Sequence, residues 1–134
     1  MVMLLSPDFV ERECPSVTLS TIARPITAEY ARNWHSIESR PIPGRENRVG
    51  PLQQTTVAGM NAWSFEESAI HYPELMHLAP GQTRPKPVRV RSVTYLLAAS
   101  SGNIEIKLSA PESIFDKHKP ALDHILASLK PLPQ

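Results

Sequence analysis

The sequence predicts an α+β fold, with a mostly antiparallel β-sheet flanked by helices as in an α/β/α sandwich. Strand-like segments come in adjacent pairs, at 52–70 and 88–108, and such pairs favour antiparallel hairpins. Two segments, 28–38 and 112–129, place apolar residues three or four positions apart, which is typical of helices with one buried face. The segment 88–99 is apolar on both faces in its second half, so we expect helices to cover both faces of the sheet.

The first third of the chain is expected to hold one strand and one helix. Residues 1–15 begin with an apolar run, and we expect Phe9 and Val10 to pack there as a first strand or arm. The alternation at 16–23 favours a strand. Thr27 is a suitable N-cap because its hydroxyl can accept a bond from a free amide of the first helical turn. The buried stripe of the helix that follows is expected to consist of Tyr30, Ala31, Trp34 and Ile37.

The middle of the chain is expected to form a loop, a hairpin and a long connection. Prolines and glycines at 40–50 predict the loop. A polar strand at 52–58 is expected at the edge of the sheet, followed by a turn at 59–61 and a second strand at 62–70. Residues 71–87 have little periodicity, and connections longer than ~12–15 residues in a compact domain are often functional.

The last third predicts a hairpin and a closing helix. A strand at 88–99, small turn-forming residues at 100–103 and an alternating strand at 104–108 indicate the hairpin. Proline in a helix interior removes a hydrogen bond and clashes with the preceding turn. We therefore expect a short helical turn at 112–118 and a main helix that starts near Pro120.

Length and composition narrow the class of protein. The 134 residues predict a single domain, 1–134, and 41% hydrophobic with 20% charged residues fits a globular protein. A net charge of +1 argues against a nucleic-acid partner, and no apolar run approaches the ~20 residues of a transmembrane segment. We expect a cytoplasmic protein if the sequence is complete and an exported one if a leader was removed. The single Cys14 excludes an internal disulfide.

The sequence offers no catalytic or metal-binding constellation. His71 and His77 could converge in the long connection, but no metal-ligand spacing accompanies them. Glu66 and Glu67 are adjacent in a strand and point to opposite faces, so they cannot act on one bond. Nucleophile-elbow and phosphate-loop motifs are absent from the sequence. We therefore expect a non-enzymatic protein with no cofactor or metal, and an enzyme that uses His71 or His77 is the least favoured alternative.

One charge feature stands above the background. Four cations and no acid occur within eight residues: Arg84, Lys86, Arg89 and Arg91. Arg89 and Arg91 project from the same face of the predicted strand. The more common interpretation is a solvated strand start whose cations are balanced across the sheet by Glu66, Glu67 or Glu105. The alternative is a docking patch for an acidic protein surface or an anionic ligand.

Several stretches of the last 80 or so residues resemble the superfamily that joins the photosystem protein PsbP, the Ran-binding protein Mog and bacterial lipoprotein-like relatives. Val57-Ala58-Gly59-Met60-Asn61-Ala62 is similar to that family's glycine-turn hairpin. The hairpin at 91–109 and the closing segment, with Ala110, Pro111, Phe115 and 125–129, extend the similarity. Asn61, where relatives often have proline, and the long 71–87 connection depart from the pattern. The resemblance implies a fold of this class and a protein that docks on other proteins or assists assembly without catalysis.

The leading prediction from sequence is a non-catalytic protein-binding or assembly module. Its partner, which we expect to carry an acidic surface, would meet the end of the sheet near 71–87. The predicted partner-binding residues are Arg84, Lys86, Arg89, Arg91, His71, Tyr72 and Trp63. A small-molecule-binding domain with a pocket between sheet and helix, opening beside Trp63 and Tyr72, is the alternative. The sequence also leaves a homodimer open.

Overall fold

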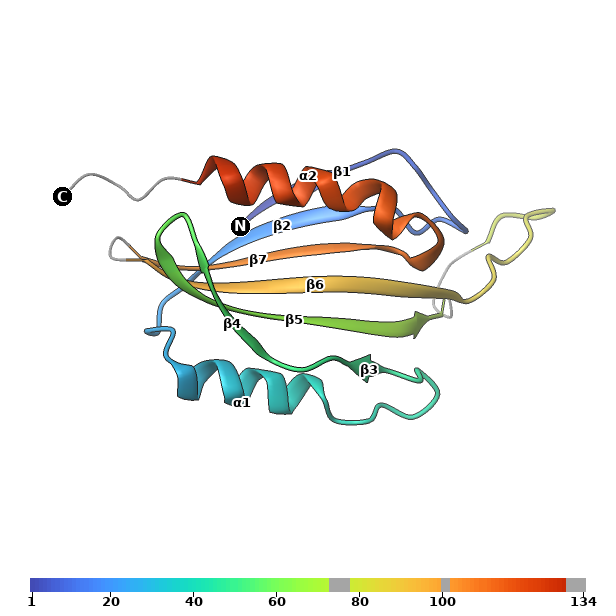
Figure 1. The fold of residues 1–134 in the computed structure, drawn as a ribbon. Helices are drawn as coiled ribbons and strands as arrows, with labels where there is room; N and C mark the ends of the chain where they lie inside the picture. Colours follow the sequence, from blue (N-terminus) through green and yellow to red (C-terminus); the bar gives the residue numbers. More distant parts are fainter. Residues whose placement is uncertain (73–77, 100–101, 130–134) are drawn as a thin grey trace.

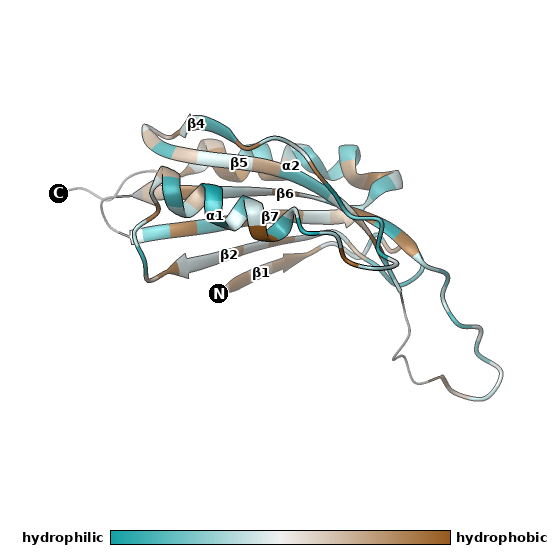
Figure 2. Cartoon of the chain, turned by 90° about the horizontal axis from the view of Figure 1, so that it is seen from below, coloured by the Kyte–Doolittle hydropathy of each residue, from teal (hydrophilic) through white to brown (hydrophobic). Residues whose placement is uncertain are grey.

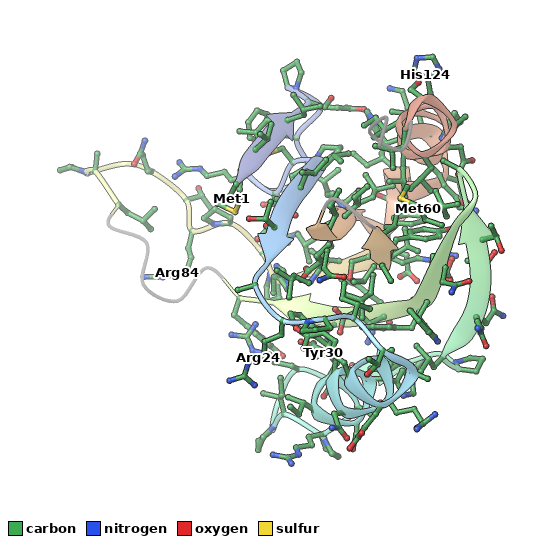
Figure 3. All side chains as sticks on the ribbon, turned by 90° about the vertical axis from the view of Figure 1, so that its left-hand side faces the viewer. Met1, Arg24, Tyr30, Met60, Arg84 and His124 are labelled. Atoms are coloured by element: carbon green, nitrogen blue, oxygen red, sulfur yellow. The ribbon has the colours of Figure 1, made fainter. Side chains whose placement is uncertain are left out.

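A computed structural model describes residues 1–72, 78–99 and 102–129. Seven strands form one antiparallel sheet in the order β1-β2-β7-β6-β5-β3, with β4 also paired to β5. The helices α1 and α2 lie on opposite faces of the sheet (Figures 1 and 3), which confirms the predicted α+β class. The elements are β1 (Val2–Leu5), β2 (Ser16–Ile22), α1 (Ala28–Glu38), β3 (Arg48–Val49), β4 (Gln53–Val57), β5 (Met60–His71), β6 (Val88–Ala99), β7 (Gly102–Pro111) and α2 (Phe115–Ser128), which follows a 3₁₀ turn, η1 (Glu112–Ile114).

The two predicted hairpins are present, and β6 lies at the centre of the sheet between β5 and β7. The β4–β5 turn differs from the prediction by one residue, because Val57 pairs with Met60 and the turn residues are Ala58 and Gly59. Both have positive φ, +51° and +79°. A two-residue hairpin loop with both central residues in the left-handed region matches the right-handed twist of the strands.

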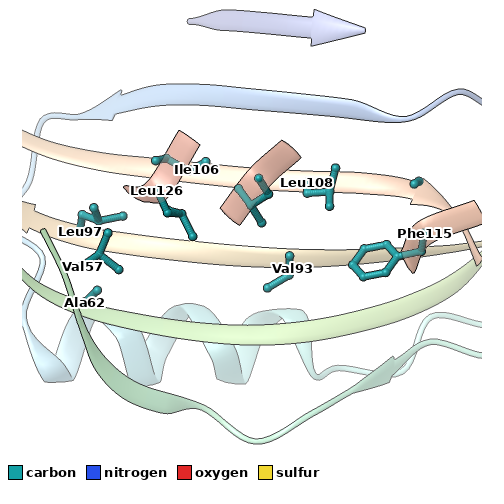
Figure 4. Packing of buried hydrophobic residues seen from close by; sticks show 10 residues of the cluster. Val57, Ala62, Val93, Leu97, Ile106, Leu108, Phe115 and Leu126 are labelled. Atoms are coloured by element: carbon teal, nitrogen blue, oxygen red, sulfur yellow. The ribbon is translucent and has the colours of Figure 1, made fainter. Parts of the chain in front are cut away.

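Two apolar cores lie on the two faces of the sheet. On one face, α2 packs over β6 and β7, and Figure 4 shows its residues meeting those of the strands. This core consists of Val57, Ala62, Val93, Leu97, Ile106, Leu108, Ala110, Phe115, Leu122 and Leu126. The smaller core beneath α1 consists of Ile26, Ala31, Trp63 and Leu96, with Tyr30 and Trp34 packed against it. Leu96 and Leu97 are both completely buried, so β6 is covered on both faces as its sequence predicts.

The helix α1 begins and ends where the sequence predicts, but its buried stripe is narrower. The Thr27 hydroxyl accepts a hydrogen bond from the Tyr30 amide at 3.1 Å, which confirms the predicted N-cap. Ala31 is buried and Trp34 half-buried, but Ile37 is 58% exposed. Its expected burial was wrong because the last turn of α1 carries the half-buried Glu38 toward the sheet instead.

The prediction that the main C-terminal helix starts near Pro120 was wrong. The helix α2 runs without a break from Phe115, and Pro120 lies inside it. Pro120 is exposed, so water can bond the carbonyl that loses its usual donor. The buried Phe115, Leu122 and Leu126 hold the helix on the sheet through both sides of the proline.

The segment that joins β1 to β2 does not pack as predicted. Val10 forms an isolated antiparallel bridge with Glu13, but Phe9 is 60% exposed. Instead, a polar contact ties the segment to α2. One carboxylate oxygen of Asp8 lies 2.9 Å from Lys117 Nζ and 3.0 Å from His118 Nε2. The side-chain hydrogen bonds from His118 and then Lys117 lower the pKa of Asp8 below its ordinary value of 3.8.

Candidate functional site

The predicted cationic patch lies at the start of β6, where two of its members are bonded to acids of the same chain. Arg89 Nη2 lies 3.1 Å from Glu46 Oε2, and its Nη1 donates to the Ser68 hydroxyl. Arg91 Nη2 lies 3.0 Å from Glu66 Oε2, which is one of the three acids that the sequence offered as balancing partners. The backbone amide of Lys86 donates to Glu11 at 3.1 Å.

Arg91 has the most extensive set of contacts in this patch. Its Nη1 lies 3.5 Å from Asp116 Oδ1 on α2, and its guanidinium carbon lies 4.5 Å from the centroid of the Phe115 ring. The hydrogen bond to Glu66 raises the pKa of Arg91 above its ordinary value. The side chain therefore fixes the start of α2 to the sheet, and its charge is already compensated within the chain.

The predicted aromatic and histidine members of the site are not gathered in one place. Tyr72 donates its hydroxyl hydrogen to the Gly44 carbonyl at 2.6 Å, and His71 Nδ1 lies 3.7 Å from Glu13 Oε1. Trp63 is buried beneath α1. It precedes His71 by eight residues along β5, which is roughly 27 Å in an extended strand. The space beside Trp63 is filled by Ile26, Ala31 and Leu96. His77, the other histidine of the enzyme alternative, lies outside the described residues.

A hollow does occur between the sheet and α2, at a different place from the one predicted. A cavity of about 370 Å³ is lined by Ser64, Tyr95 and Lys119, among other residues. A second one, of about 280 Å³, shares Gly50 and Glu66 with it and extends toward Arg91. The lining of the larger cavity is mostly polar, and Glu66, which lines both cavities, is already bonded to Arg91.

The opposite face of the sheet carries a partly buried acidic cluster beneath the end of α1. Glu67 Oε1 lies 3.3 Å from Lys107 Nζ and accepts a hydrogen bond from the Ser92 hydroxyl at 3.3 Å. Burial and then the neighbouring Glu67 raise the pKa of Glu38. Burial also raises the pKa of Glu105. Within residues 1–72, 78–99 and 102–129, no group of three His, Cys, Asp or Glu side chains could hold a metal ion.

A surface that the sequence did not single out lies at the outer edge of the sheet, along β1. Its four side chains are all apolar and all at least half exposed: Val2 58%, Met3 50%, Leu4 56% and Leu5 63%. Figure 2 shows β1 as a hydrophobic strand beyond β2, on the side of the sheet that α1 leaves uncovered. We call these four residues, Val2–Leu5, the β1 edge.

An apolar groove adjoins the β1 edge on the α2 face. Its volume is about 160 Å³. Leu4 and Leu5 line it from β1, Val17 from β2, and Ala121 and Ile125 from α2. The β1 edge and this groove therefore form a continuous apolar surface, and surfaces of this kind on folded proteins commonly mark sites of interaction.

Comparison with known proteins supports the fold alone. No family model matches the chain, and no curated protein matches it in sequence. The fold is similar to the crystal structure of PA94 from Pseudomonas aeruginosa, a protein of unknown function described as a candidate regulator. The two align with a TM-score of 0.67 at 15% identity, over 99% of this chain and 83% of PA94.

The sequence missed the β1 edge because a short apolar run reads the same whether the strand is buried or exposed. One signal was available: residues 1–5 hold five apolar side chains without alternation. An alternating pattern would mark a strand with one solvated face, whereas this run needs cover on both faces.

In the part of the chain that the structure describes, none of the helices is long and apolar enough to cross a membrane.

Proposed function

We propose that this chain is a non-catalytic protein-binding module and that it holds its partner at the β1 edge. The observation that carries the proposal is the exposure of four consecutive apolar side chains on a strand whose outer side pairs with no other strand among the described residues. Edge strands of this kind pair readily with other chains, and proteins usually protect them with charges, prolines or bulges. The β1 edge has none of these.

The cationic end of the sheet is the weaker candidate for the binding surface. Arg89 and Arg91 have acidic partners at 3.1 and 3.0 Å, so a foreign acid would have to displace Glu46 or Glu66. Exchanging one partly exposed ion pair for another brings little net free energy. Burial of the apolar side chains of the β1 edge, by contrast, breaks no ion pair of that strand.

The resemblance to PsbP- and Mog-like proteins supports the same class of function. That resemblance implies proteins that dock on other proteins or assist assembly. It rests on the segment 57–62 and on the C-terminal hairpin and helix, which in this chain form the body of the sheet and its cover. The resemblance therefore supports the kind of scaffold. We propose the β1 edge as the place on that scaffold where a partner binds.

Site-specific photo-crosslinking tests the proposal. A photo-activatable phenylalanine analogue at Leu4 should form an adduct of defined mass in cells that make the protein. The matched control is the same analogue at Gln54, which is exposed on β4 at the other side of the sheet. The Leu4 adduct should disappear when Leu5→Lys is added. Equal adducts at the two positions, or none at Leu4, would contradict the proposal.

A small-molecule-binding function is the second candidate, and the cavity of about 370 Å³ beside Tyr95 favours it. Ligand pockets commonly have volumes of roughly 300–1,000 Å³. A ligand in a metabolite mixture should raise the melting temperature of the wild-type protein. Ser64→Phe, which places a ring in the cavity, should abolish the rise. A rise of the same size in both proteins would exclude this cavity as the site.

A further inference from the structure

The backbone of β1 presents hydrogen-bonding groups on its outer side. The Ser6 amide donates to the Pro15 carbonyl at 3.0 Å, so Ser6 directs its backbone toward β2. Backbone direction alternates along an antiparallel strand. The N–H and C=O groups of Val2 and Leu4 therefore also point toward β2, and those of Met3 and Leu5 point outward. In the described part of the chain, no strand pairs with that outer side.

The two edges of the sheet differ in how they are protected. At the far edge, β3 has two residues and begins with Arg48, and β4 is polar, with the sequence QQTTV. Pro51 separates the two short strands. Such features hinder pairing with another chain. The β1 edge has no charge, proline or bulge, so of these two edges it is the one suited to strand addition.

We propose that a second copy of this chain pairs with β1 in an antiparallel manner about a two-fold axis at Leu4. The inference rests on the proposed function, because it names the partner that the β1 edge binds. The two sheets would join into one continuous sheet. On one face Leu4 would meet Leu4 of the second copy, with Val2 opposite Ser6, and on the other face Met3 would meet Leu5 of the second copy.

Symmetry limits the register of such a pair. A two-fold axis between antiparallel neighbours runs perpendicular to the sheet, so each face continues into the same face of the second copy. Residues that lie opposite each other on paired strands share a face of the sheet, and successive residues of one strand alternate between the faces. One residue of β1 must therefore lie opposite the same residue of the second copy. With Leu4 at the axis, Met3 lies opposite Leu5 of the second copy, and all outward groups of both residues are bonded. With Met3 at the axis, Leu5 would lie opposite Met1, outside β1.

Charge does not oppose pairing with a second copy. Two identical strands repel each other wherever a charged residue meets itself, and the β1 edge carries no charge. The nearest acid along the chain, Asp8, is paired with Lys117 at 2.9 Å. Four residues per copy make a small interface, and interfaces below about 1,200 Å² are usually of the weak, transient kind. We therefore expect a dimer that dissociates on dilution.

Disulfide trapping in a Cys14→Ser background tests the inference. Residues opposite each other at a non-hydrogen-bonded position have Cα atoms about 4.5 Å apart, which is within disulfide range. Leu4→Cys should therefore form a linked dimer at least about tenfold faster than Met3→Cys, whose own counterpart is displaced by two residues. Gln54→Cys reports the rate of random collision. The proposal would be overturned if the Leu4→Cys protein formed the linked dimer no faster than the Gln54→Cys protein, or more slowly than the Met3→Cys protein.

Sedimentation of the full chain without engineered cysteines gives the second readout. The Cys14→Ser protein should shift from monomer to dimer as its concentration rises, and Leu4→Lys should raise the dissociation constant at least about tenfold by burying a charge. A monomer at every concentration would overturn the inference. If that monomer still formed a Leu4 photo-adduct with another protein, the proposed function would stand with a different partner. Without any adduct, both would fail.

Discussion

Arg91 lies over the ring of Phe115, with its guanidinium carbon 4.5 Å from the ring centroid. The contact joins β6, the central strand, to the first residue of α2. Arg91 was predicted from sequence to bind a partner, but this contact gives it a structural role within the chain. The side chain that could attract an acidic partner is held by Phe115, Glu66 and Asp116.

A double-mutant cycle measures this contact. Arg91→Met and Phe115→Leu keep most of the apolar volume and remove the cation and the ring, respectively. Partly buried cation–ring pairs contribute about 0.5–2 kcal/mol, so the coupling free energy should be about 1 kcal/mol in urea unfolding. Additive effects of the two substitutions would show that the ring does not bind the cation.

The β1 edge should contribute little to the stability of the monomer. Leu4→Ala should lower the free energy of unfolding of dilute protein by less than about 1 kcal/mol, because Leu4 is already more than half exposed. Leu122→Ala, at a fully buried position on α2, should cost about 2–5 kcal/mol. Denaturant unfolding of the two variants side by side makes the comparison. A loss at Leu4 as large as at Leu122 would mean that β1 serves the core.

The acidic cluster beneath α1 predicts a pH dependence of known sign. A carboxyl group whose pKa is raised on folding favours the folded state fully below its ordinary value, here 4.5, and loses that contribution as the pH rises through the raised pKa. Glu38→Gln should therefore be more stable than the wild type at pH 7 and converge with it toward pH 4.5. Parallel stability curves would contradict this. Asp8, whose pKa is lowered, has the opposite sign, because its contribution to stability is fully present above 3.8 and is lost as the pH falls through the lowered pKa.

The β4–β5 turn contains a residue in an unfavourable conformation. Ala58 has φ +51°, and the left-handed region costs most residues roughly 1–2 kcal/mol, whereas asparagine tolerates it. Ala58→Asn creates the Asn-Gly pair that such hairpins prefer and should raise the free energy of unfolding by about 0.5–1 kcal/mol. Gly59→Ala, at φ +79°, should lower it. Thermal or urea unfolding of both variants decides the matter, and a destabilised Ala58→Asn would contradict it.

The regular elements were predictable because their signals are local. Alternation identified the two hairpins, and the hydroxyl of Thr27 placed the start of α1. Pro120 misled because the penalty for proline depends on whether the freed carbonyl meets water, and only the packed structure shows that Pro120 is exposed. Phe9 and Ile37 misled for a similar reason, because hydrophobic residues are often exposed.

The candidate site depended on contacts between distant segments. The sequence offered Glu66 as a partner of Arg91, because strand pairing brings residues of neighbouring strands together. It could not predict Asp116 or Glu46, whose positions depend on where α2 and the 40–50 loop settle. The β1 edge became visible only when β2 paired with β7 and left β1 as the outermost strand.

Amide hydrogen exchange at single residues of β1 tests the central claim, that its outer edge binds another strand. The Leu4 amide faces β2, and the Met3 and Leu5 amides face outward. We predict that Met3 and Leu5 exchange freely in dilute protein and become protected as the concentration of the chain rises, while Leu4 is protected throughout. Unchanged exchange at Met3 and Leu5 over the whole concentration range, with Leu4 protected, would contradict the pairing.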